Sequence, residues 1–239
     1  TYGVGQLILA AAESGVEKII VGLGGSSTND GGCGAAAAVG VKFYDKDGKK
    51  FVPTGGTTAD ICKIDLSGKA EILNKVEIIT MCDIDNPMYG PTGASHIFGP
   101  QKGADEAMVL ELDEGIKNLS RAITEAIGKD ISEVPGTGAA GAMGAGMIAF
   151  FNSRLQMGIQ TVLDTVKFDE MISDADYIIT GEGKLDSQSL RGKVVIGIAE
   201  RAKKQDKNVI AVVGGADDAE IDKAYEMGVT AVFPINRLA

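Results

Sequence analysis

The sequence has no tryptophan, a single histidine and three cysteines among its 239 residues. Because His96 is the only histidine, a hydrolase that activates serine or cysteine with a histidine base is disfavoured, and we expect a structural role for His96. Cys33, Cys62 and Cys82 are an odd number and lack the spacing of a disulfide framework. We therefore expect reduced thiols, as in cytoplasmic proteins.

Positive charge is also scarce, with 23 Lys and Arg against 33 Asp and Glu and a net charge of −10. Proteins that bind nucleic acids present a basic face, so this class is disfavoured, as is binding to an anionic membrane. No apolar run approaches the roughly 18 residues of a membrane span, and no signal peptide is recognised. The sequence thus predicts a cytoplasmic protein, and a site for an anion would be built locally from backbone N–H groups, lysines and a metal ion.

Glycine is abundant, at 33 residues. The glycines are not periodic, and they cluster after apolar runs, where a backbone turns sharply or approaches a ligand. The chain starts at Thr1 and enters a helix with no strand before it. We therefore expect it to be part of a longer protein.

The order of apolar patterns predicts an α/β fold. Helices are expected over residues 5–14, 34–39, 104–127, 194–204 and 217–227, and strands over 18–22, 77–81, 176–180, 208–213 and 229–234, with a hairpin formed by residues 41–44 and 50–52. The alternation of strand and helix after residue 176 indicates a parallel sheet, whose ligands lie at the carboxyl ends of the strands. A change of domain is expected between residues 160 and 170.

The segment Gly22–Gly32 (GLGGSSTNDGG) follows a strand and leads into a helix. Glycines there let backbone N–H groups converge on an anion, and the helix N-terminus adds positive potential. The alternative is a tight turn in which Asn29 or Asp30 caps the helix. The segment is not a dinucleotide fingerprint, because Ser27 stands where GxGxxG needs glycine, and the chain has no Walker A sequence.

Three further segments carry candidate site residues. Asp83 and Asp85 follow the strand over residues 77–81 and suit Mg²⁺. The alternative is that this segment is only a turn, because Asn86–Pro87 is a common turn sequence.

Lys102 lies between turn residues before a long helix. It could neutralise a transferring phosphoryl group or be a solvated turn lysine.

Residues 135–146 are nearly all small and predict a helix that packs tightly against its neighbours. The segment 181–193 (GEGKLDSQSLRGK) is expected to be a loop at the end of a central strand. It combines carboxylates, cations and an amide within a few residues, which is hard to explain by structure alone. Its candidate site residues are Glu182, Lys184, Asp186 and Arg191.

Four motifs in this order resemble the bacterial glycerate kinase family, the type without a Walker motif: GLGGSSTNDGGCG, CDIDNPMYGPTGASHIFGPQKGA, PGTGAAGAMGAG and TGEGKLDSQSLRGK. The resemblance implies ATP-dependent phosphorylation of D-glycerate with Mg²⁺, and it favours 2-phosphoglycerate as the product over 3-phosphoglycerate, which some family members are assigned to make. It also implies an inserted α/β domain over residues 1–165, and the returning half of a Rossmann- or flavodoxin-like parallel sheet over 166–239. The family's PDSFKGS-like and ADGGEGT-like motifs do not occur in this sequence.

These motifs assign hypothetical roles. Nucleotide phosphates would be bound by Gly24, Gly25, Ser26, Ser27, Thr28 and Asn29, and Mg²⁺ would be held by Asp83 or Asp85. Lys102 would offset the charge that develops on the phosphoryl group, and Asp186, or else Asp30, would accept the proton of the glycerate hydroxyl. The substrate would be contacted by Glu182, Lys184 and Arg191.

Several alternatives remain open at this stage. Residues 22–32 could bind glycerate instead of ATP. The protein could be a non-catalytic binder of a small anion or sugar acid, or a kinase for another small hydroxy acid. Monomer and homodimer are both compatible with the sequence.

Overall fold

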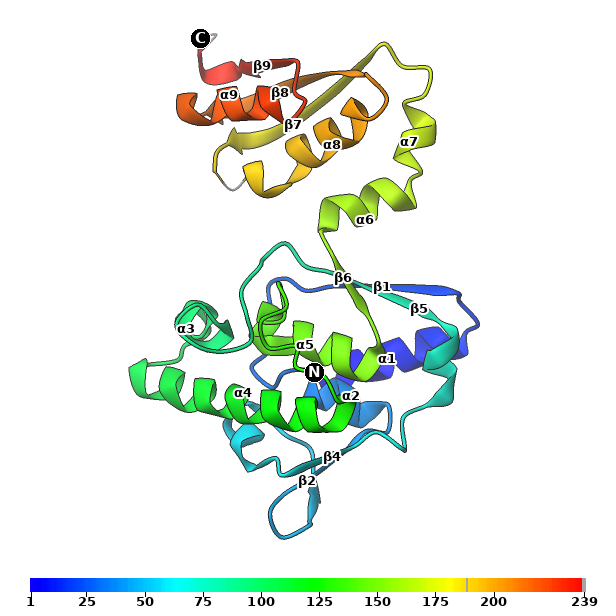
Figure 1. The fold of residues 1–239 in the computed structure, drawn as a ribbon, viewed down its shortest axis with the longest axis vertical. Coiled ribbons are helices and arrows are strands. Elements are labelled where there is room, and N and C mark those ends of the chain that lie inside the picture. Colours follow the sequence, from blue (N-terminus) through cyan, green and yellow to red (C-terminus); the bar gives the residue numbers. More distant parts are fainter. Residues whose placement is uncertain (188, 238–239) are drawn as a thin grey trace. The chain divides into compact units, whose positions relative to one another are not determined.

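The computed structural model describes residues 1–187 and 189–237, with the side chain of Arg191 excepted. The chain divides into two compact units, Thr1–Gln156 and Met157–Ala239 (Figure 1). The division comes earlier than the sequence suggested, because the helix that begins at Gly158 packs within the second unit. Ile159 of this helix lies so close to Gly197 that a Cβ on Gly197 would be 2.7 Å from the Ile159 side chain.

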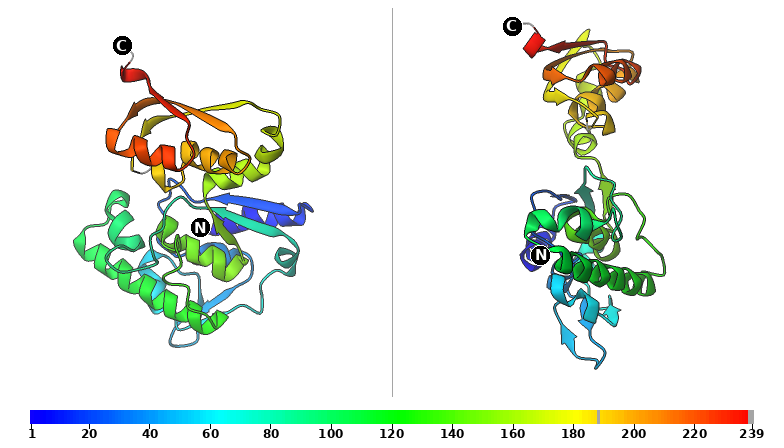
Figure 2. Two further views of the ribbon diagram at one scale, coloured as in Figure 1. Left: turned by 45° about the horizontal axis from the view of Figure 1, so that its top comes forward. Right: turned by 90° about the vertical axis from the view of Figure 1, so that its left-hand side faces the viewer.

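The first unit contains two three-stranded sheets, one parallel with strand order β1-β5-β6 and one antiparallel with order β3-β2-β4. The two sheets lie at opposite ends of this unit, with α5 between them (Figures 1 and 2). The elements are α1 (Tyr2–Glu13), β1 (Lys18–Gly22), α2 (Cys33–Ala38), β2 (Lys42–Tyr44), β3 (Lys50–Phe51), η1 (Gly55–Asp60), β4 (Lys63–Asp65), η2 (Glu71–Lys75), β5 (Glu77–Met81), α3 (Ala94–Phe98), η3 (Pro100–Lys102), α4 (Glu106–Ile127), α5 (Ala139–Phe151) and β6 (Arg154–Gln156).

The expected strands over residues 18–22 and 77–81 are confirmed with the same bounds. The expected hairpin is confirmed as β2 and β3, each strand one residue shorter than predicted. The sequence analysis missed the short elements β4, β6 and α3. Each spans only three to five residues, which is too short for a helical or alternating apolar pattern to be recognised.

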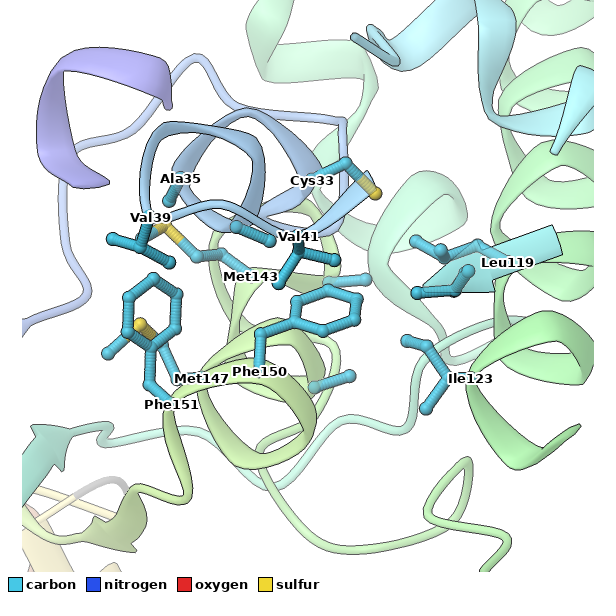
Figure 3. Close-up of a cluster of buried hydrophobic side chains, with 14 of the residues drawn as sticks. Cys33, Ala35, Val39, Val41, Leu119, Ile123, Met143, Met147, Phe150 and Phe151 are labelled. Carbon is cyan, nitrogen blue, oxygen red and sulfur yellow. The ribbon is translucent and has the colours of Figure 1, made fainter. Parts of the chain in front are cut away.

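The core of the first unit is built around α5 (Figure 3). Phe150 is fully buried, and its ring meets that of Phe43 edge to face with the ring centroids 5.8 Å apart. Met147 of α5 and Leu119 of α4 are also fully buried in this cluster. The long helix predicted over residues 104–127 is confirmed as α4, and its buried residues Leu119 and Ile123 belong to the same core cluster.

The second unit contains a parallel sheet with strand order β7-β8-β9, which confirms the expected parallel arrangement. Its elements are α6 (Gly158–Thr165), α7 (Phe168–Met171), β7 (Tyr177–Leu185), η4 (Ser189–Arg191), α8 (Val194–Lys203), β8 (Asn208–Ala216), α9 (Asp218–Glu226), β9 (Ala231–Pro234) and η5 (Ile235–Arg237). No helix among the described residues of either unit is long and apolar enough to cross a membrane.

In the described part of the second unit, helices cover one face of this sheet. Ile178 and Val209 are buried in one cluster with Ile196 of α8. On the opposite face Ile179 is 73% exposed, and Phe233 is also exposed.

Arg201 of α8 connects three helices of the second unit. Its guanidinium donates to Asp164 at 2.7 Å and to Asp169 at 3.0 and 2.5 Å, and its side chain is only 16% exposed. The hydrogen bonds from Arg201 hold the pKa of Asp169 below its usual value. A carboxyl group whose pKa is lower in the folded protein than in the unfolded chain stabilises the fold at pH values above the unfolded-state pKa. This contribution is lost as the pH falls through the folded-state pKa.

We predict that Arg201→Gln lowers the stability of the second unit by about 1–3 kcal/mol at pH 7, the usual range for hydrogen bonds to charged groups. The loss should be smaller at pH 3, because the stabilisation that comes with the lowered pKa of Asp169 diminishes as the pH falls below the unfolded-state pKa. Hydrogen exchange of the β7 and β8 backbone amides reports this stability. Arg121→Gln, which breaks an exposed i,i+4 pair with Glu125, is the control and should change little. An equal loss at both pH values would contradict the role given to Asp169.

Candidate functional site

The pairing of β1 with β5 brings two of the predicted loops to the same edge of the parallel sheet. The strands are parallel, with Gly22 opposite Met81, and the Leu23 N–H donates to the Met81 carbonyl at 3.0 Å. Residues 22–32, here the glycine loop, and residues 82–87, here the acidic loop, therefore leave the sheet side by side. This edge is where ligands bind in open parallel sheets.

The first part of the glycine loop has an open face. A Cβ placed on Gly24 or Gly25 would meet no atom within 4 Å, and Gly25 has a φ of +59° in the left-handed region. The protein's own packing therefore gives no reason for glycine at position 24. A glycine at a position where packing leaves room for a side chain is expected where a ligand approaches the backbone closely.

Lys102 reaches the glycine loop from η3. Its Nζ donates to the Thr28 carbonyl at 2.6 Å. The side chain is half-buried, and this burial lowers the pKa of Lys102 from its usual value. Lys102 is thus a positioned cation at the predicted loop rather than a solvated turn lysine.

Asn29 carries an unusual polar atom. Its Oδ1 is buried and has no hydrogen-bond partner among the described residues. Most buried polar atoms in proteins are paired, so an exception calls for an explanation such as a ligand contact.

Asp30 is only 8% exposed, and its carboxylate accepts from backbone N–H groups at the start of α2. Oδ1 accepts from the Gly32 N–H at 2.9 Å, while Oδ2 accepts from the Gly34 N–H at 3.2 Å and from the Thr1 hydroxyl at 2.6 Å. Both oxygens are therefore engaged in shaping the helix start. This geometry agrees with the alternative in which Asp30 holds the start of the helix, and the catalytic role that was the second choice for Asp30 stays a prediction.

The acidic loop presents its two aspartates outward. Asp83 and Asp85 are exposed, whereas Cys82 is buried and its thiol donates to the Ile84 carbonyl at 3.3 Å. Burial raises the pKa of Cys82, and the charges of both aspartates raise it further. Asn86 has a turn role, because its side chain donates to the Thr92 carbonyl at 2.8 Å.

Two exposed carboxylates suit one particular kind of metal site. No group of three or more His, Cys, Asp or Glu side chains able to hold a metal ion occurs in the described part of the chain. Mg²⁺, however, is usually held by one or two carboxylates together with substrate phosphates and water. Asp83 and Asp85 fit this requirement.

The small-residue segment packs against both loops, and the expected tight packing is confirmed. A Cβ on Gly138 would lie 2.2 Å from the Pro87 carbonyl oxygen of the acidic loop, and one on Gly141 would lie 1.9 Å from the Thr28 carbonyl oxygen of the glycine loop. The Gly31 N–H donates to the Gly141 carbonyl at 3.0 Å. The sequence analysis predicted a helix here but not that its start is left-handed.

The polar residues of the second unit lie partly on a strand. β7 runs to Leu185, so Glu182 and Lys184 are strand residues, and the loop expected from residue 181 onward starts later. Lys184 pairs with Asp217 at 2.9 Å, a partner that the sequence analysis did not single out. The hydrogen bond and charge of Asp217 raise the pKa of Lys184, and Asp186 adds to the effect. Glu182 Oε1 is buried without a hydrogen-bond partner among the described residues.

Asp186 stands directly after β7 in a tight turn. Its Oδ1 accepts from the Ser189 N–H at 3.3 Å, and its own N–H donates to the Ser189 hydroxyl at 3.2 Å. Ser189 is buried and also donates to the Lys184 carbonyl at 3.0 Å. The turn fixes the backbone of Asp186 beside the two strand residues. The side chain of Arg191 lies outside the described part of the structure.

His96 belongs to a structural cluster. Its Nε2 lies 3.7 Å from Asp113, whose carboxylate accepts from the Gly90 N–H at 3.0 Å. These contacts tie the segment before α3 to α4, which agrees with the structural role expected for the histidine.

Comparison with known proteins places these features in a family. The model of the glycerate kinase family matches residues 1–239. Glycerate kinase from Bacillus cereus is 47% identical over 235 residues, and glycerate 2-kinase from Escherichia coli is 45% identical over 233 residues; each alignment covers 98% of this chain and 61% of the relative. The crystal structure of a protein assigned as glycerate kinase 2 from Salmonella typhimurium LT2 has a TM-score of 0.84 and 40% identity, and the match covers 98% of this chain and 60% of that one.

The chain thus spans about three fifths of the length of the relatives that it matches. Its four motifs, its fold and these alignments agree. The chain belongs to the glycerate kinase family.

Proposed function

We propose that the protein to which this chain belongs transfers the γ-phosphoryl group of ATP to a hydroxyl of D-glycerate and forms 2-phosphoglycerate. Family membership and the names of several relatives support the kinase activity, and the name glycerate 2-kinase of the Escherichia coli relative supports the product. The structural observation that carries the proposal is the open backbone of Gly24 and Gly25 on a loop whose Thr28 carbonyl holds the half-buried Lys102 ammonium.

In the first unit, the glycine loop is suited to bind phosphate oxygens. Backbone N–H groups from Gly24 to Thr28, assisted by the hydroxyls of Ser26 and Ser27 and the side-chain NH₂ group of Asn29, would donate to them. Lys102 would offset the charge that develops as the phosphoryl group transfers. Phosphoryl transfer depends mainly on such positioning and charge neutralisation.

Asp83 and Asp85 would hold Mg²⁺ together with the nucleotide phosphates. Their outward position and the lack of a third ligand group in the described residues favour a metal shared with the phosphates. Bound there, the ion would neutralise phosphate charge.

In the second unit, Asp186 is the group proposed to accept the proton of the glycerate hydroxyl. As that proton moves to the carboxylate, the hydroxyl oxygen bonds to the γ-phosphorus, and the bond to the bridging oxygen of ADP breaks. Lys184, kept protonated by Asp217, and Glu182 are proposed to contact substrate. Arg191 is proposed to pair with the glycerate carboxylate.

The cytoplasm is the compartment we propose for this reaction. Cys33, Cys62 and Cys82 are all free in the structure, which fits a reducing environment.

The proposed function predicts ADP formation that depends on D-glycerate when the full-length protein is incubated with MgATP. Adding enolase to the same assay tests the product, because enolase dehydrates 2-phosphoglycerate directly. The absence of glycerate-dependent ADP would favour a binding protein without catalytic activity. Turnover of another hydroxy acid in place of glycerate would reassign the substrate.

Asp186→Asn should lower kcat at least 100-fold, within the roughly 10²–10⁴-fold range of acid–base catalysis, while the Kd for ATP changes little. The asparagine side chain can still accept from the Ser189 N–H, so the turn should be kept. Asp176→Asn, near the other end of β7, is the matched control and should leave kcat unchanged. Steady-state kinetics and ATP titration separate the two effects. Turnover near that of the parent protein would remove Asp186 from the catalytic role.

Ser26→Ala should raise the KM for ATP several-fold if its hydroxyl donates to a nucleotide phosphate, because one hydrogen bond to a charged group is lost. The KM for glycerate should stay constant. Ser14→Ala, an exposed serine at the end of α1, serves as the control. A change confined to the KM for glycerate would assign the glycine loop to the acceptor substrate.

A further inference from the structure

The start of α5 has a backbone conformation that L-residues rarely adopt. Ala140, Gly141 and Ala142 have φ values of 51°, 62° and 65°, so three successive residues form a left-handed turn. Two of the three carry a side chain. Strained backbone of this kind persists where the surroundings enforce it, and it is frequent at functional sites.

The left-handed turn changes what the Gly141 carbonyl does. In a right-handed first turn, this carbonyl would accept from the N–H of Ala145, four residues on. Here the Ala145 N–H donates to the Thr137 carbonyl at 3.1 Å, and the Gly141 carbonyl accepts from the Gly31 N–H at 3.0 Å. The turn therefore directs a backbone acceptor at the glycine loop.

The same turn touches the middle of the glycine loop. A Cβ on Gly141 would lie 1.9 Å from the Thr28 carbonyl oxygen and 2.7 Å from Asn29 Cα. The two backbones are thus in direct contact, and only glycine fits at position 141.

Gly55 of η1 approaches Asn29 as well. A Cβ on Gly55 would lie 3.0 Å from Asn29 Cβ and 3.2 Å from the Asn29 carbonyl oxygen. The η1 turn is itself held by Asn118 of α4, whose side-chain amide donates to two of its carbonyls and to that of the following residue, Ile61, at 2.9–3.1 Å. Together with the Lys102 contact to Thr28, three separate elements converge on two loop residues.

We infer that the left-handed turn of residues 140–142, together with Gly55, is a positioning element that fixes Thr28 and Asn29 for ligand binding. The buried, unpartnered Oδ1 of Asn29 lies at the point where these contacts meet. This inference rests on the proposed function and deepens it: the turn and Gly55 determine how the loop presents its amides and the Asn29 side chain to the phosphates. None of these positioning residues needs to touch the ligand.

The test compares two alanine substitutions of matched severity in the full-length protein. Gly141→Ala places a Cβ at a φ of +62° and 1.9 Å from a backbone oxygen of the glycine loop. Gly40→Ala places one at a φ of +101° and 2.0 Å from the Gly68 carbonyl oxygen, in a different part of the first unit. Both should lower Tm.

Only Gly141→Ala should lower kcat/KM for MgATP, by about 100-fold per folded molecule, as expected when a binding group is displaced by about 1 Å. Gly40→Ala should stay within about twofold of the parent, because its close contact is with Gly68 and not with the glycine loop. Equal kinetic constants for the two variants, corrected for the folded fraction, would overturn the inference.

Gly55→Ala provides the evidence if Gly141→Ala does not fold. Its closest contacts are 3.0–3.2 Å, so Asn29 needs to move by only a few tenths of an ångström. We expect little change in Tm and a severalfold rise in the KM for ATP. An unchanged KM with unchanged exchange of the Asn29 amide would count against the inference.

Hydrogen exchange of the Gly31 amide separates this inference from the proposed function. If the parent protein forms no glycerate-dependent ADP, the proposed function fails, but the exchange experiment still applies. Faster exchange of Gly31 in Gly141→Ala, and not in Gly40→Ala, supports the positioning role. Equal exchange in the two variants contradicts it.

Discussion

The arrangement of the first unit depends on close contacts between backbone segments, which are possible because the residue at each point of contact is a glycine without a Cβ. Gly138 packs against the Pro87 carbonyl, Gly141 against the Thr28 carbonyl, and Gly146 against the Gly31 carbonyl. A Cβ added to any of these glycines would lie only about 2 Å from the carbonyl oxygen. The helix that carries these glycines also carries the Phe150 side chain into the core. The positions of both loops are therefore tied to the packing of the core, and a shift of α5 would move them together.

Sheet pairing supplies the second constraint. Because β1 and β5 are parallel and in register from Lys18 opposite Glu77 to Gly22 opposite Met81, the loops that follow them must leave the sheet at one edge. This edge combines exposed glycine backbone, the ammonium of Lys102 and two outward carboxylates. A protein with a net charge of −10 can bind an anion in such a place, since local amides, one cation and a shared metal ion decide the local potential.

The sequence predicted those features that have a repeating or bounded signal. The strand Lys18–Gly22 is an apolar run bounded by glycine, and it was recovered with its bounds. The left-handed turn over residues 140–142 could not be recognised, because alanine and glycine carry no periodic apolar signal there. Asp30 was ambiguous because an aspartate just before a helix fits both a cap and a catalytic base, and its hydrogen bonds to the backbone could not be read from the sequence. The strand residue Glu182 was assigned to a loop because its glycine neighbours suggest a turn.

The energetics of the left-handed turn explain its order of residues. An alanine in this conformation costs about 1–2 kcal/mol, whereas a glycine loses roughly 0.5–1 kcal/mol more than alanine in chain entropy on folding. Ala142 is fully buried, and its methyl group adds about 0.8 kcal/mol of apolar burial. These terms nearly cancel, so alanine at position 142 is close to neutral. At position 141 no such balance exists, because the Thr28 carbonyl occupies the space of a methyl group. The order Ala-Gly-Ala therefore places a side chain where the core has room and none where the glycine loop lies against the turn.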